Sequence, residues 1–492
     1  MRALVCAAAL AALCGCASRG DFFQDAGTPP SLAPRPLAAW PWDEIWTGVV
    51  FRDRKIGFSR LALRPAADAP GLWEIESESA LRLRFLGIDK RVSLRALDRV
   101  RGDLTLERFR YEYLLDGNVL HVEGERTGDA LVVRTQSGGT RREQRLAMAR
   151  AAIPASALGL LPVARGMRAG ETLRATVFVG ESQELADAEQ RLLGYERSTL
   201  FEGSAYRMQT RLLGVQTETW LDAHGRPLLE SAMHGAMISA LEEPERARAY
   251  LVEASLNRQE TLLEFSLLPS AALPEARRIA ALFIAVDGVP PALAVPDSGG
   301  QRCARRDLRI ECRVDRRAPA PPGDAREAEA YLRPTLAAPS NERQFVDLAR
   351  ALVAGAADAP ARIARLLEWI DANIAKEAVD AFTAADVLRE RRAECQGHAY
   401  LFAALARAVG LPTRVVNGLV YAPEHGGFLY HAWNEVWIAG EGWRPVDPTF
   451  AQARADATHL ALAVGESAAA LAPLAGMVGR ARVLEVRDVA HW

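Results

Sequence analysis

The residues best suited to covalent chemistry lie between positions 393 and 450, where Cys395, His431 and Asp447 follow one another. A thiol becomes an effective nucleophile as its thiolate, which needs a positive local field and a neighbouring base. An imidazole can serve as that base when a carboxylate fixes its tautomer and orientation. The three residue types therefore match a nucleophile, a base and an orienting acid, in that order.

An amphipathic helix is expected to begin at Cys395. The apolar residues after it recur at the spacing of one helix face, and the pattern ends at Gly410 with Pro412 just beyond. The first backbone N–H groups of a helix lack partners within it, and its dipole favours negative charge at that end. The thiolate would be stabilised there, and the Cys395 N–H could face a developing oxyanion.

Strands are expected after this helix, over TRVVNGLVY, LYHAWNEVWI and WRPVDPTF, with a glycine-rich turn between the last two. Alternation of side chains places His431 on one face of the second strand with Trp433, Glu435 and Trp437, so that the imidazole would lie beside two indoles. A hairpin between the last two strands would bring Asp447 within hydrogen-bonding distance of His431.

These segments also resemble a known family. Cys395-Gln-Gly-His398-Ala, LARAVGLPTRVVNG, HAWNEVW and GWRPVDPTF are similar to the transglutaminase-like superfamily, whose members have a papain-like cysteine-enzyme fold. The resemblance covers roughly residues 340 to 465, including DATHLAL at 456 to 462. It implies that Cys395 is the nucleophile, His431 the base and Asp447 the orienting acid. One feature of the family is not met, because no side-chain oxyanion donor can be named upstream, where the chain reads LRERRAEC.

Each candidate also has a plainer interpretation. Cys395 alone could be a buried structural cysteine, and His431 alone a packed core histidine. Asp447, which precedes a proline, could be a turn residue that bonds its own backbone. The joint pattern favours the catalytic interpretation, since all three would have to converge by coincidence otherwise.

His398 is a rival base, because it lies one helical turn from Cys395. A side chain at that position points along the helix, however, and is poorly aimed at the thiol. Gln396, His398 and Trp433 are therefore expected as supporting residues around the site. A zinc site built from Cys395, His398 and His431 would lack a clear fourth ligand, so neither a metal nor another cofactor is expected.

The first sixteen residues indicate the compartment. Met1-Arg2 precedes a short apolar run that is too short to span a bilayer, which is typical of a signal peptide. Its end, Leu13-Cys14-Gly15-Cys16, resembles a bacterial lipobox, so Cys16 is the expected lipidation site. Ala17 at the next position favours the outer membrane, facing the periplasm. The alternative is an ordinary cleaved secretory signal.

Three cysteines remain beyond this segment. In an oxidising envelope, Cys303 and Cys312 could close a short hairpin as a disulfide, although two free buried cysteines are the alternative. Cys395 would then be the unpaired thiol, and such a thiol in a secreted chain is often reactive. This argument supports the nucleophile independently of the family resemblance.

Length and composition predict several domains. The 492 residues, 49% hydrophobic, suffice for two or three packed cores. The fold class expected is α+β, with a papain-like or transglutaminase-like core after a mostly antiparallel β domain, in which only residues 150–165 and 184–194 have a helical pattern. The expected segments are a signal peptide with a lipobox at 1–16, a linker at 17–39, a β-rich envelope domain at 40–265, a Pro-rich junction with a Cys hairpin at 266–325, a transglutaminase-like catalytic domain at 326–475 and a C-terminal strand or tail at 476–492.

Two classes of function follow. The first is thiol-dependent acyl transfer or hydrolysis on peptide amides of an envelope protein or peptide, as a peptidase, an amidase or a transglutaminase-type enzyme. The second is a non-catalytic envelope lipoprotein that binds a protein, a peptide or a lipid. The membrane would be contacted through the lipid anchor in both cases. A formal net charge of -2 gives no reason to expect a nucleic-acid partner.

Overall fold

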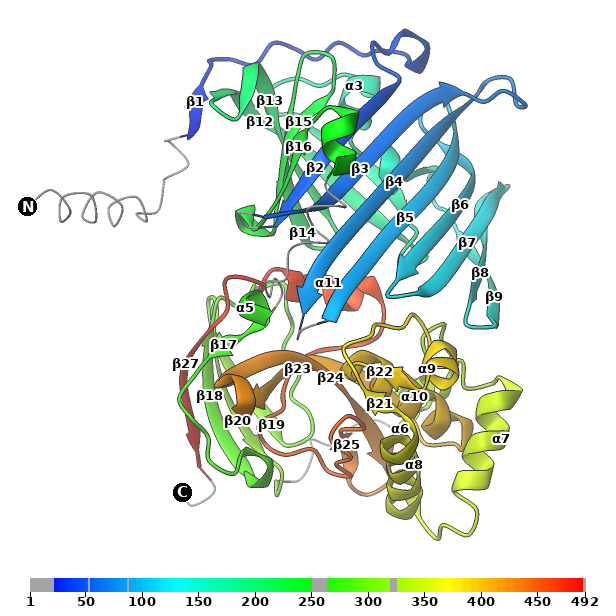
Figure 1. Ribbon diagram of the computed structural model, residues 1–492, viewed down its shortest axis with the longest axis vertical. Coiled ribbons are helices and arrows are strands. Elements are labelled where there is room, and N and C mark those ends of the chain that lie inside the picture. The colour runs from blue at the N-terminus through cyan, green and yellow to red at the C-terminus, as the bar shows by residue number, and fades with distance from the viewer. Residues whose placement is uncertain (1–21, 52–53, 86–87, 250–262, 319–324, 490–492) are drawn as a thin grey trace, which may run out of the picture.

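The computed structural model describes residues 22–51, 54–85, 88–249, 263–318 and 325–489. A curved β domain forms the upper half of the molecule in Figure 1, and a unit of helices and strands forms the lower half. The signal peptide expected at 1–16 and the lipidation site expected at Cys16 lie outside the described residues. None of the helices in the described ranges is both long and apolar enough to cross a lipid bilayer.

Sixteen strands of the described chain form one sheet, which confirms the expected mostly antiparallel β region. From β2 to β9 and from β11 to β16, strands that follow one another in sequence pair antiparallel, whereas β10 and β11 run parallel and β1 pairs with β12. The last strand of the domain, β16, returns to pair with β2. The strands are β1 (Phe23–Asp25), β2 (Glu44–Phe51), β3 (Arg54–Pro65), β4 (Leu72–Phe85), β5 (Ile88–Arg101), β6 (Leu106–Leu115), β7 (Asn118–Thr127), β8 (Ala130–Ser137), β9 (Thr140–Ala147), β10 (Ala152–Pro154), β11 (Thr172–Val179), β12 (Glu184–Ser198), β13 (Phe201–Leu212), β14 (Val215–Leu221), β15 (Pro227–Ala232) and β16 (Met237–Leu241).

The sheet bends so that its inner face packs on itself. Phe109 of β6 and Phe178 of β11 lie far apart in the order of strands, yet their ring centroids are 4.5 Å apart. The 3-10 helix η2 (Ala155–Ala157) and the helix α3 (Leu161–Arg165) contribute to the same buried cluster. Burial of this face, at roughly 25 cal/mol per Å² of apolar surface, stabilises the curvature.

Two expectations for this domain are wrong. Residues 184–194 form part of β12 instead of a helix, because pairing with β11 and β13 satisfies their backbone groups on both edges. The linker expected at 17–39 packs on the domain in its described part, residues 22–39, since β1 pairs with β12 and the side chains of Leu32 and Leu37 are buried. The expected helix at 150–165 is reduced to η2 and α3 after the short strand β10.

The C-terminal unit is built around one buried helix, α10, which begins at Cys395 and ends before Gly410 as expected. Its side chains form a core with the surrounding helices and with β23 and β24. A capping box of Thr383 and Asp386 starts the preceding helix α9. The helices are α5 (Leu263–Ser266), α6 (Ala325–Glu329), α7 (Arg343–Leu352), α8 (Ala359–Asn373), α9 (Ala384–Glu390), α10 (Cys395–Ala408) and α11 (Ala468–Ala475).

The strands of this unit form three sheets. One has the order β17-β24-β23-β26, with β25 paired to β24, one has the order β19-β20-β18-β27, and β21 pairs with β22. The expected hairpin of the second and third strands after α10 is present as β24 and β25. The strands are β17 (Leu268–Pro269), β18 (Ala281–Asp287), β19 (Gln301–Arg306), β20 (Arg309–Asp315), β21 (Ala375–Lys376), β22 (Arg392–Ala393), β23 (Thr413–Ala422), β24 (Gly427–Ile438), β25 (Gly442–Val446), β26 (Leu460–Val464) and β27 (Arg482–Asp488).

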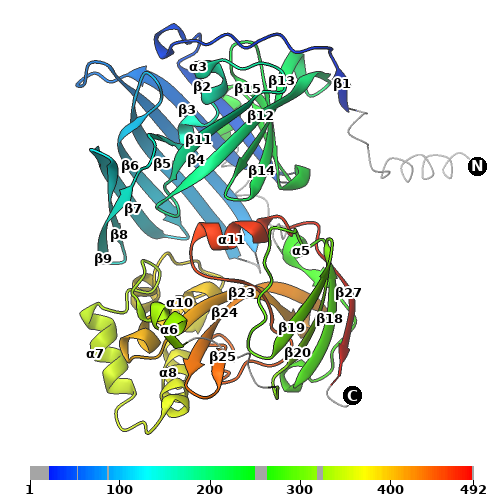
Figure 2. The ribbon, with the colours of Figure 1, turned by 180° about the vertical axis from the view of Figure 1, so that it is seen from behind.

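The region expected as a junction at 266–325 is a folded layer in its described part. Cys303 and Cys312 are paired residues of β19 and β20, and they form a disulfide bond. The C-terminal strand β27 completes this sheet by pairing with β18 (Figure 2). Its apolar face packs on residues of β23 and β26, so the layer supports the sheet that carries His431.

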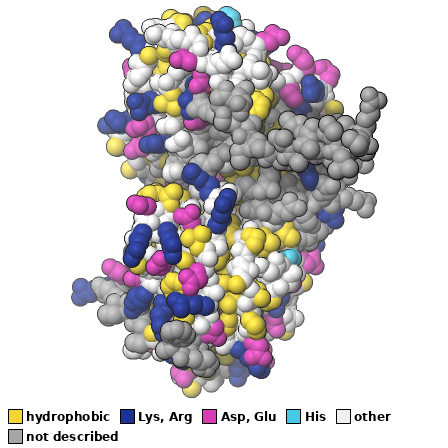
Figure 3. Space-filling view, turned by 90° about the vertical axis from the view of Figure 1, so that its left-hand side faces the viewer, with side chains coloured by type: hydrophobic (Ala, Val, Ile, Leu, Met, Phe, Trp, Pro, Cys, Tyr) yellow, Lys and Arg dark blue, Asp and Glu magenta, His cyan; other side chains and the backbone are white. Residues whose placement is uncertain are grey.

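The surface of this layer is mixed in charge. Figure 3 shows the face that carries β18, β20 and β27 in its lower half, where basic side chains lie among acidic and apolar ones. Arg309 lies 2.7 Å from Glu311, and Arg487 lies 3.1 Å from Glu485. Pairs of this kind leave no extended basic surface on the face shown, in agreement with the nearly balanced formal charge.

Lys90 of the β domain is buried against the C-terminal unit. It is only 5% exposed, and its Nζ lies 2.8 Å from a carboxylate oxygen of both Asp116 and Asp380. Burial alone would lower the pKa of Lys90, but Asp380 and Asp116 outweigh it and raise the pKa. Asn118, in the same region of the β domain, donates to the Asp380 carbonyl at 2.8 Å. The β domain is therefore fastened to the segment that leads to α9 and α10.

We expect Lys90→Met to lower the free energy of unfolding by about 3 kcal/mol, because it leaves the buried Asp116 and the partly buried Asp380 side by side without a cation. Urea unfolding of the chain from Ala17 onward measures this change. The matched control is Lys376→Met, which removes an exposed ion pair with Asp371 and should change the stability by less than about 1 kcal/mol. Equal effects of the two variants would contradict the role given to Lys90.

Candidate active site

Cys395 is the first residue of α10, and Glu394 caps this helix through a hydrogen bond from the Gly397 N–H to its Oε1, 3.0 Å long. The backbone N–H of Ala432, which follows His431 on β24, acts to lower the pKa of the Cys395 thiol, so this part of the strand lies near the sulfur. Asn434, two residues further, donates to the Ala399 carbonyl of α10 at 3.1 Å. The start of α10 is thereby fixed against the strand that carries the histidine.

Asp447 connects two imidazoles. Its Oδ2 lies 2.8 Å from His431 Nε2 and 2.8 Å from His459 Nε2, and its other oxygen accepts the backbone N–H groups of Thr449 and Phe450. Burial alone would raise the pKa of this carboxyl, but His431 and His459 outweigh it and hold the pKa well below its usual range. Asp447 is therefore ionised, as the expected orienting acid must be.

The hydrogen bond to Asp447 settles the tautomer of His431. A carboxylate only accepts hydrogen bonds, so Nε2 carries the proton in the neutral ring and Nδ1 keeps a lone pair. That nitrogen can take a proton from a nucleophile, and the imidazolium formed would be stabilised by Asp447. The pair of His431 and Asp447 matches the base and orienting acid expected from the sequence.

Aromatic rings enclose His431, although not the two indoles expected. Trp433 lies with its ring centroid 6.0 Å from the imidazole, and Phe450 stacks on it at 5.1 Å. Trp437 pairs instead with Trp443 across the hairpin, at 5.5 Å between centroids. Phe450 lies in the turn after Asp447, beyond the end of β25. Its contact with His431 could not be predicted from the alternation of side chains along β24, because Phe450 is not part of that strand.

His459, which the sequence offered only as a possible supporting residue of the site, makes a contact with Asp447 that the sequence did not specify. It precedes β26, is fully buried, and contacts the Asp456 carbonyl through Nδ1 at 3.1 Å. Burial alone would lower its pKa, but Asp447 and Asp456 outweigh it and raise the pKa. The resemblance at 456–462 includes this residue, but only pairing of β26 with β23 brings it to Asp447.

The Cys395 thiol is not hydrogen-bonded to His431, the base expected for it. Its Sγ hydrogen-bonds Glu394 Oε2 at 3.0 Å, and no hydrogen bond joins it to His431, both residues being within the described chain. Burial and Glu394 together raise the pKa of the Cys395 thiol well above its usual value. Burial and the nearby Asp380 raise the pKa of Glu394 as well. The expectation that the helix N-terminus lowers the thiol pKa is wrong for this arrangement, because the capping carboxylate and burial outweigh the helix dipole.

The three residues expected to support the site are His398, Gln396 and Trp433. Within the described chain, their hydrogen bonds and ring contacts are with residues other than Cys395. His398 is fully buried and its Nδ1 contacts the Glu394 carbonyl at 2.9 Å, so it bonds locally as expected. Gln396 donates to the hydroxyl of Tyr400, one turn further along the helix. Trp433 packs between His431 and His459, and its indole nitrogen is buried without a partner among the described residues.

His431, Asp447 and His459 form the cluster whose geometry comes nearest to a metal site, with one ligand atom from each lying within 4.8 Å of the others. Both imidazoles direct Nε2 at the same carboxylate oxygen at 2.8 Å, which is a hydrogen-bond length. A metal would need both nitrogens without their protons. The arrangement fits a carboxylate held by two N–H donors better than a metal centre.

Comparison with known proteins gives the family of this region. The model of the transglutaminase-like superfamily matches residues 346–448, which include Cys395, His431 and Asp447. The chain carries a transglutaminase-like core. The match covers α8, α9, α10 and the β23–β25 hairpins, and it ends one residue after Asp447. No curated protein matches the sequence significantly.

Solved structures resemble this chain only distantly. A candidate cysteine protease from Cytophaga hutchinsonii is 18% identical, with 42% of this chain and 87% of that chain covered and a TM-score of 0.29. A β-barrel-like protein of a domain of unknown function from Brucella abortus is 9% identical, with 41% and 95% covered and a TM-score of 0.30. A candidate protease from Parabacteroides distasonis is 12% identical, with 78% and 65% covered and a TM-score of 0.19.

We expect Glu394→Gln to lower the pKa of the Cys395 thiol, because the amide oxygen can still cap α10 while the negative charge beside the sulfur is removed. Iodoacetamide at pH 7.5 should then label Cys395 at least about ten times faster than in the wild type, since one pKa unit changes the thiolate fraction about tenfold. Intact-protein mass spectrometry follows the labelling. Glu390→Gln, at a half-exposed acid of α9, is the control, and equal rates in both variants would contradict the effect assigned to Glu394.

Proposed function

We propose that this protein is a thiol-dependent enzyme that transfers the acyl group of a peptide amide to water or to an amine, with Cys395, His431 and Asp447 as its triad. The observation that carries the proposal is the pair of contacts on one strand. Asp447 Oδ2 lies 2.8 Å from His431 Nε2, and the backbone N–H of the next residue of β24, Ala432, acts to lower the pKa of the Cys395 thiol. The match to the transglutaminase-like superfamily supports a hydrolase or acyltransferase of the cysteine type.

In the proposed reaction, the thiol first exchanges its hydrogen bond to Glu394 for one to His431 Nδ1. His431 takes the proton as the sulfur attacks the amide carbonyl, and Asp447 stabilises the imidazolium. The Cys395 N–H, at the free end of α10, donates to the oxyanion. Collapse of the intermediate breaks the C–N bond, and His431 gives its proton to the leaving amine. A thioester on Cys395 remains.

Water or a second amine then attacks this thioester, with His431 as base. The products are a free carboxylic acid in the first case and a new amide in the second, and the thiol is regenerated in both. Trp433 and Phe450 both stack on His431, which limits the access of water to the ring without selecting between the two acceptors.

The proposed location is the bacterial envelope, with Cys16 as a lipid anchor in the outer membrane and the enzyme facing the periplasm. The Cys303–Cys312 disulfide supports an oxidising compartment. The substrate would then be an envelope protein or peptide. The segment between Cys16 and the first strand is short, so the enzyme would act near the membrane surface.

A binding function without turnover is the second candidate, and one observation favours it. The thiol bonds a carboxylate instead of the imidazole, and its pKa is raised by burial and by Glu394. A protein in which this arrangement never opens could still bind a peptide beside β24. The two candidates differ in whether Cys395 ever carries an acyl group.

We expect the chain from Ala17 onward to form an acyl adduct on Cys395 when it is incubated with envelope peptides, and to release hydrolysed peptides or, with a biotinylated alkylamine present, tagged ones. Loss of the nucleophile in Cys395→Ala or of the base in His431→Ala should reduce turnover by at least about a hundredfold. Intact-protein and peptide mass spectrometry detect both products.

The matched control is His425→Ala, at a histidine six residues before His431 in the turn that precedes β24, and it should keep full turnover. If Cys395→Ala and the wild type bind the same peptides and neither changes them, the binding function replaces the enzymatic one.

A further inference from the structure

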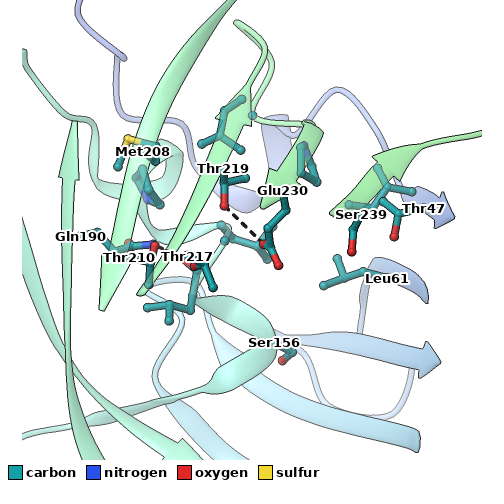
Figure 4. A pocket seen from close by; sticks show the side chains of 18 of the residues that line it. Thr47, Leu61, Ser156, Gln190, Met208, Thr210, Thr217, Thr219, Glu230 and Ser239 are labelled. Carbon is teal, nitrogen blue, oxygen red and sulfur yellow. Dashed lines mark hydrogen bonds between the residues drawn. The ribbon is translucent and has the colours of Figure 1, made fainter. Parts of the chain in front are cut away.

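The curved β domain encloses a cavity that the candidate active site does not use. Its volume is about 310 Å³, and it lies inside the bend of the sheet, lined by β2, β3 and β12 to β16, with Ser156 of η2 at its base. Figure 4 shows Ser239 of β16 beside Thr47 of the neighbouring strand β2. Sites for small molecules have volumes in this range or above it. The cavity therefore has room for part of a small molecule.

The lining of this cavity is unusually polar for the inner face of a sheet. The inward face of a folded sheet is normally apolar, because it forms the core. Here the strands place six hydroxyl side chains around the space, at Thr47, Ser59, Thr210, Thr217, Thr219 and Ser239. Leu61, Leu160 and Met208 supply apolar surface beside them. The mixture of hydroxyl and apolar side chains is typical of a site for an amphipathic ligand and not of a packed hydrophobic core.

Glu230 on β15 is the charged group of the cavity. Its Oε2 accepts a hydrogen bond of 3.3 Å from Thr219, and within the described residues no Lys, Arg or His forms an ion pair with it. Burial raises its pKa, although the carboxyl keeps some solvent access because the cavity lies beside it. By contrast, Glu218, on the neighbouring strand, pairs with Arg207 at 2.8 Å. A buried carboxyl without a cation is costly, and a cationic ligand would remove that cost.

Gln190 on β12 provides a second, independent observation. It is only 3% exposed and lines the same cavity, where Figure 4 shows it beside Thr210. Its Nε2 donates to the Leu158 carbonyl at 3.0 Å and to Thr210 Oγ1 at 3.2 Å. Its Oε1 is buried without any hydrogen-bond partner among the described residues. An unpaired buried acceptor of this kind calls for a donor from a ligand.

An apolar cavity adjoins the polar one. A second cavity of about 530 Å³ shares Leu158, Thr210 and Thr217 with the first. Its walls are mainly apolar, from Leu212 and Val215 of the β domain and from Leu471 of α11, and Glu181 is the one carboxyl among its described lining residues. The two adjoining cavities, together called the hollow, thus lie between Glu230 and a helix of the C-terminal unit, and the one nearer that helix is the more apolar.

We propose that this hollow binds a cationic amphiphile, a molecule with a protonated amine that pairs with Glu230 and an apolar chain that extends past Gln190 and Leu158 toward α11. The ammonium group supplies the charge that Glu230 lacks. A hydroxyl or amide N–H near the amine would donate to Gln190 Oε1. The apolar chain would cover Leu212, Val215 and Leu471, and would contact both halves of the protein.

Calorimetric titration of the chain from Ala17 onward with decylamine, decan-1-ol and decanoate, each below its micellar concentration at pH 7, tests the proposal. The three probes share one chain and differ in the charge of the head group. We expect decylamine to bind at least about tenfold more tightly than decan-1-ol, since a charge-assisted hydrogen bond is roughly twice as strong as a neutral one. Decanoate should bind more weakly than either.

Glu230→Gln keeps the size of the side chain and should remove the preference for the amine. Glu218→Gln is the matched control, because this carboxylate lies in the outward ion pair of the neighbouring strand, where Arg207 also contacts Glu196, and it should keep the preference. Thr217→Trp should block the passage between the two cavities and weaken decylamine and decan-1-ol alike. Thermal unfolding of each variant shows whether it is folded.

Equal affinities for decylamine and decan-1-ol in the wild type would overturn the proposal, and so would a preference for decanoate or no binding of any probe. A preference for the amine that survives Glu230→Gln in a folded protein would overturn the role of Glu230. These outcomes are independent of turnover at Cys395, so the proposed enzymatic function can fail or stand without affecting them.

Discussion

The candidate site depends on a single buried carboxylate. Asp447 is ionised and fully buried, which is unfavourable unless every lone pair is satisfied. Two imidazoles and two backbone N–H groups meet this requirement, and they come from β24, from the turn after β25 and from the start of β26. The same hydrogen bonds that make the ion stable also fix the orientation of His431. Structure and chemistry are therefore coupled at this residue.

The thiol experiences two opposing electrostatic effects at the start of α10. The helix dipole and the Ala432 N–H favour a thiolate, whereas burial and the Glu394 carboxylate favour the thiol. Glu394 cannot simply be absent, because it caps the helix by accepting the Gly397 N–H. The residue that begins the helix is thus also the one that keeps the nucleophile protonated in this arrangement.

The contacts that join the β domain to the C-terminal unit include residues close to the proposed nucleophile, Cys395. Lys90 bridges Asp116 and Asp380, and Asp380 in turn raises the pKa of Glu394 beside Cys395. On the other side, Leu471 of α11 lines the apolar cavity under the curved sheet. A ligand in that cavity and a substrate at Cys395 would therefore occupy separate sites in one connected structure.

The sequence alone determined the features that depend on local patterns. The helix that begins at Cys395, the hairpin that carries His431 and Asp447 and the antiparallel character of the first half follow from spacing within a few tens of residues. The sequence left the Cys303–Cys312 disulfide as one of two alternatives, and the structure decided it. Only the tertiary structure decided which groups meet across longer distances. His459 reaches Asp447 because β26 pairs with β23, Phe450 covers His431 because of a turn, and β12 is a strand because it has a partner on each edge. The hydrogen bond between Cys395 and Glu394 could not be predicted from their adjacency in the sequence, because side chains of neighbouring residues meet only when the backbone conformation and burial direct them toward each other.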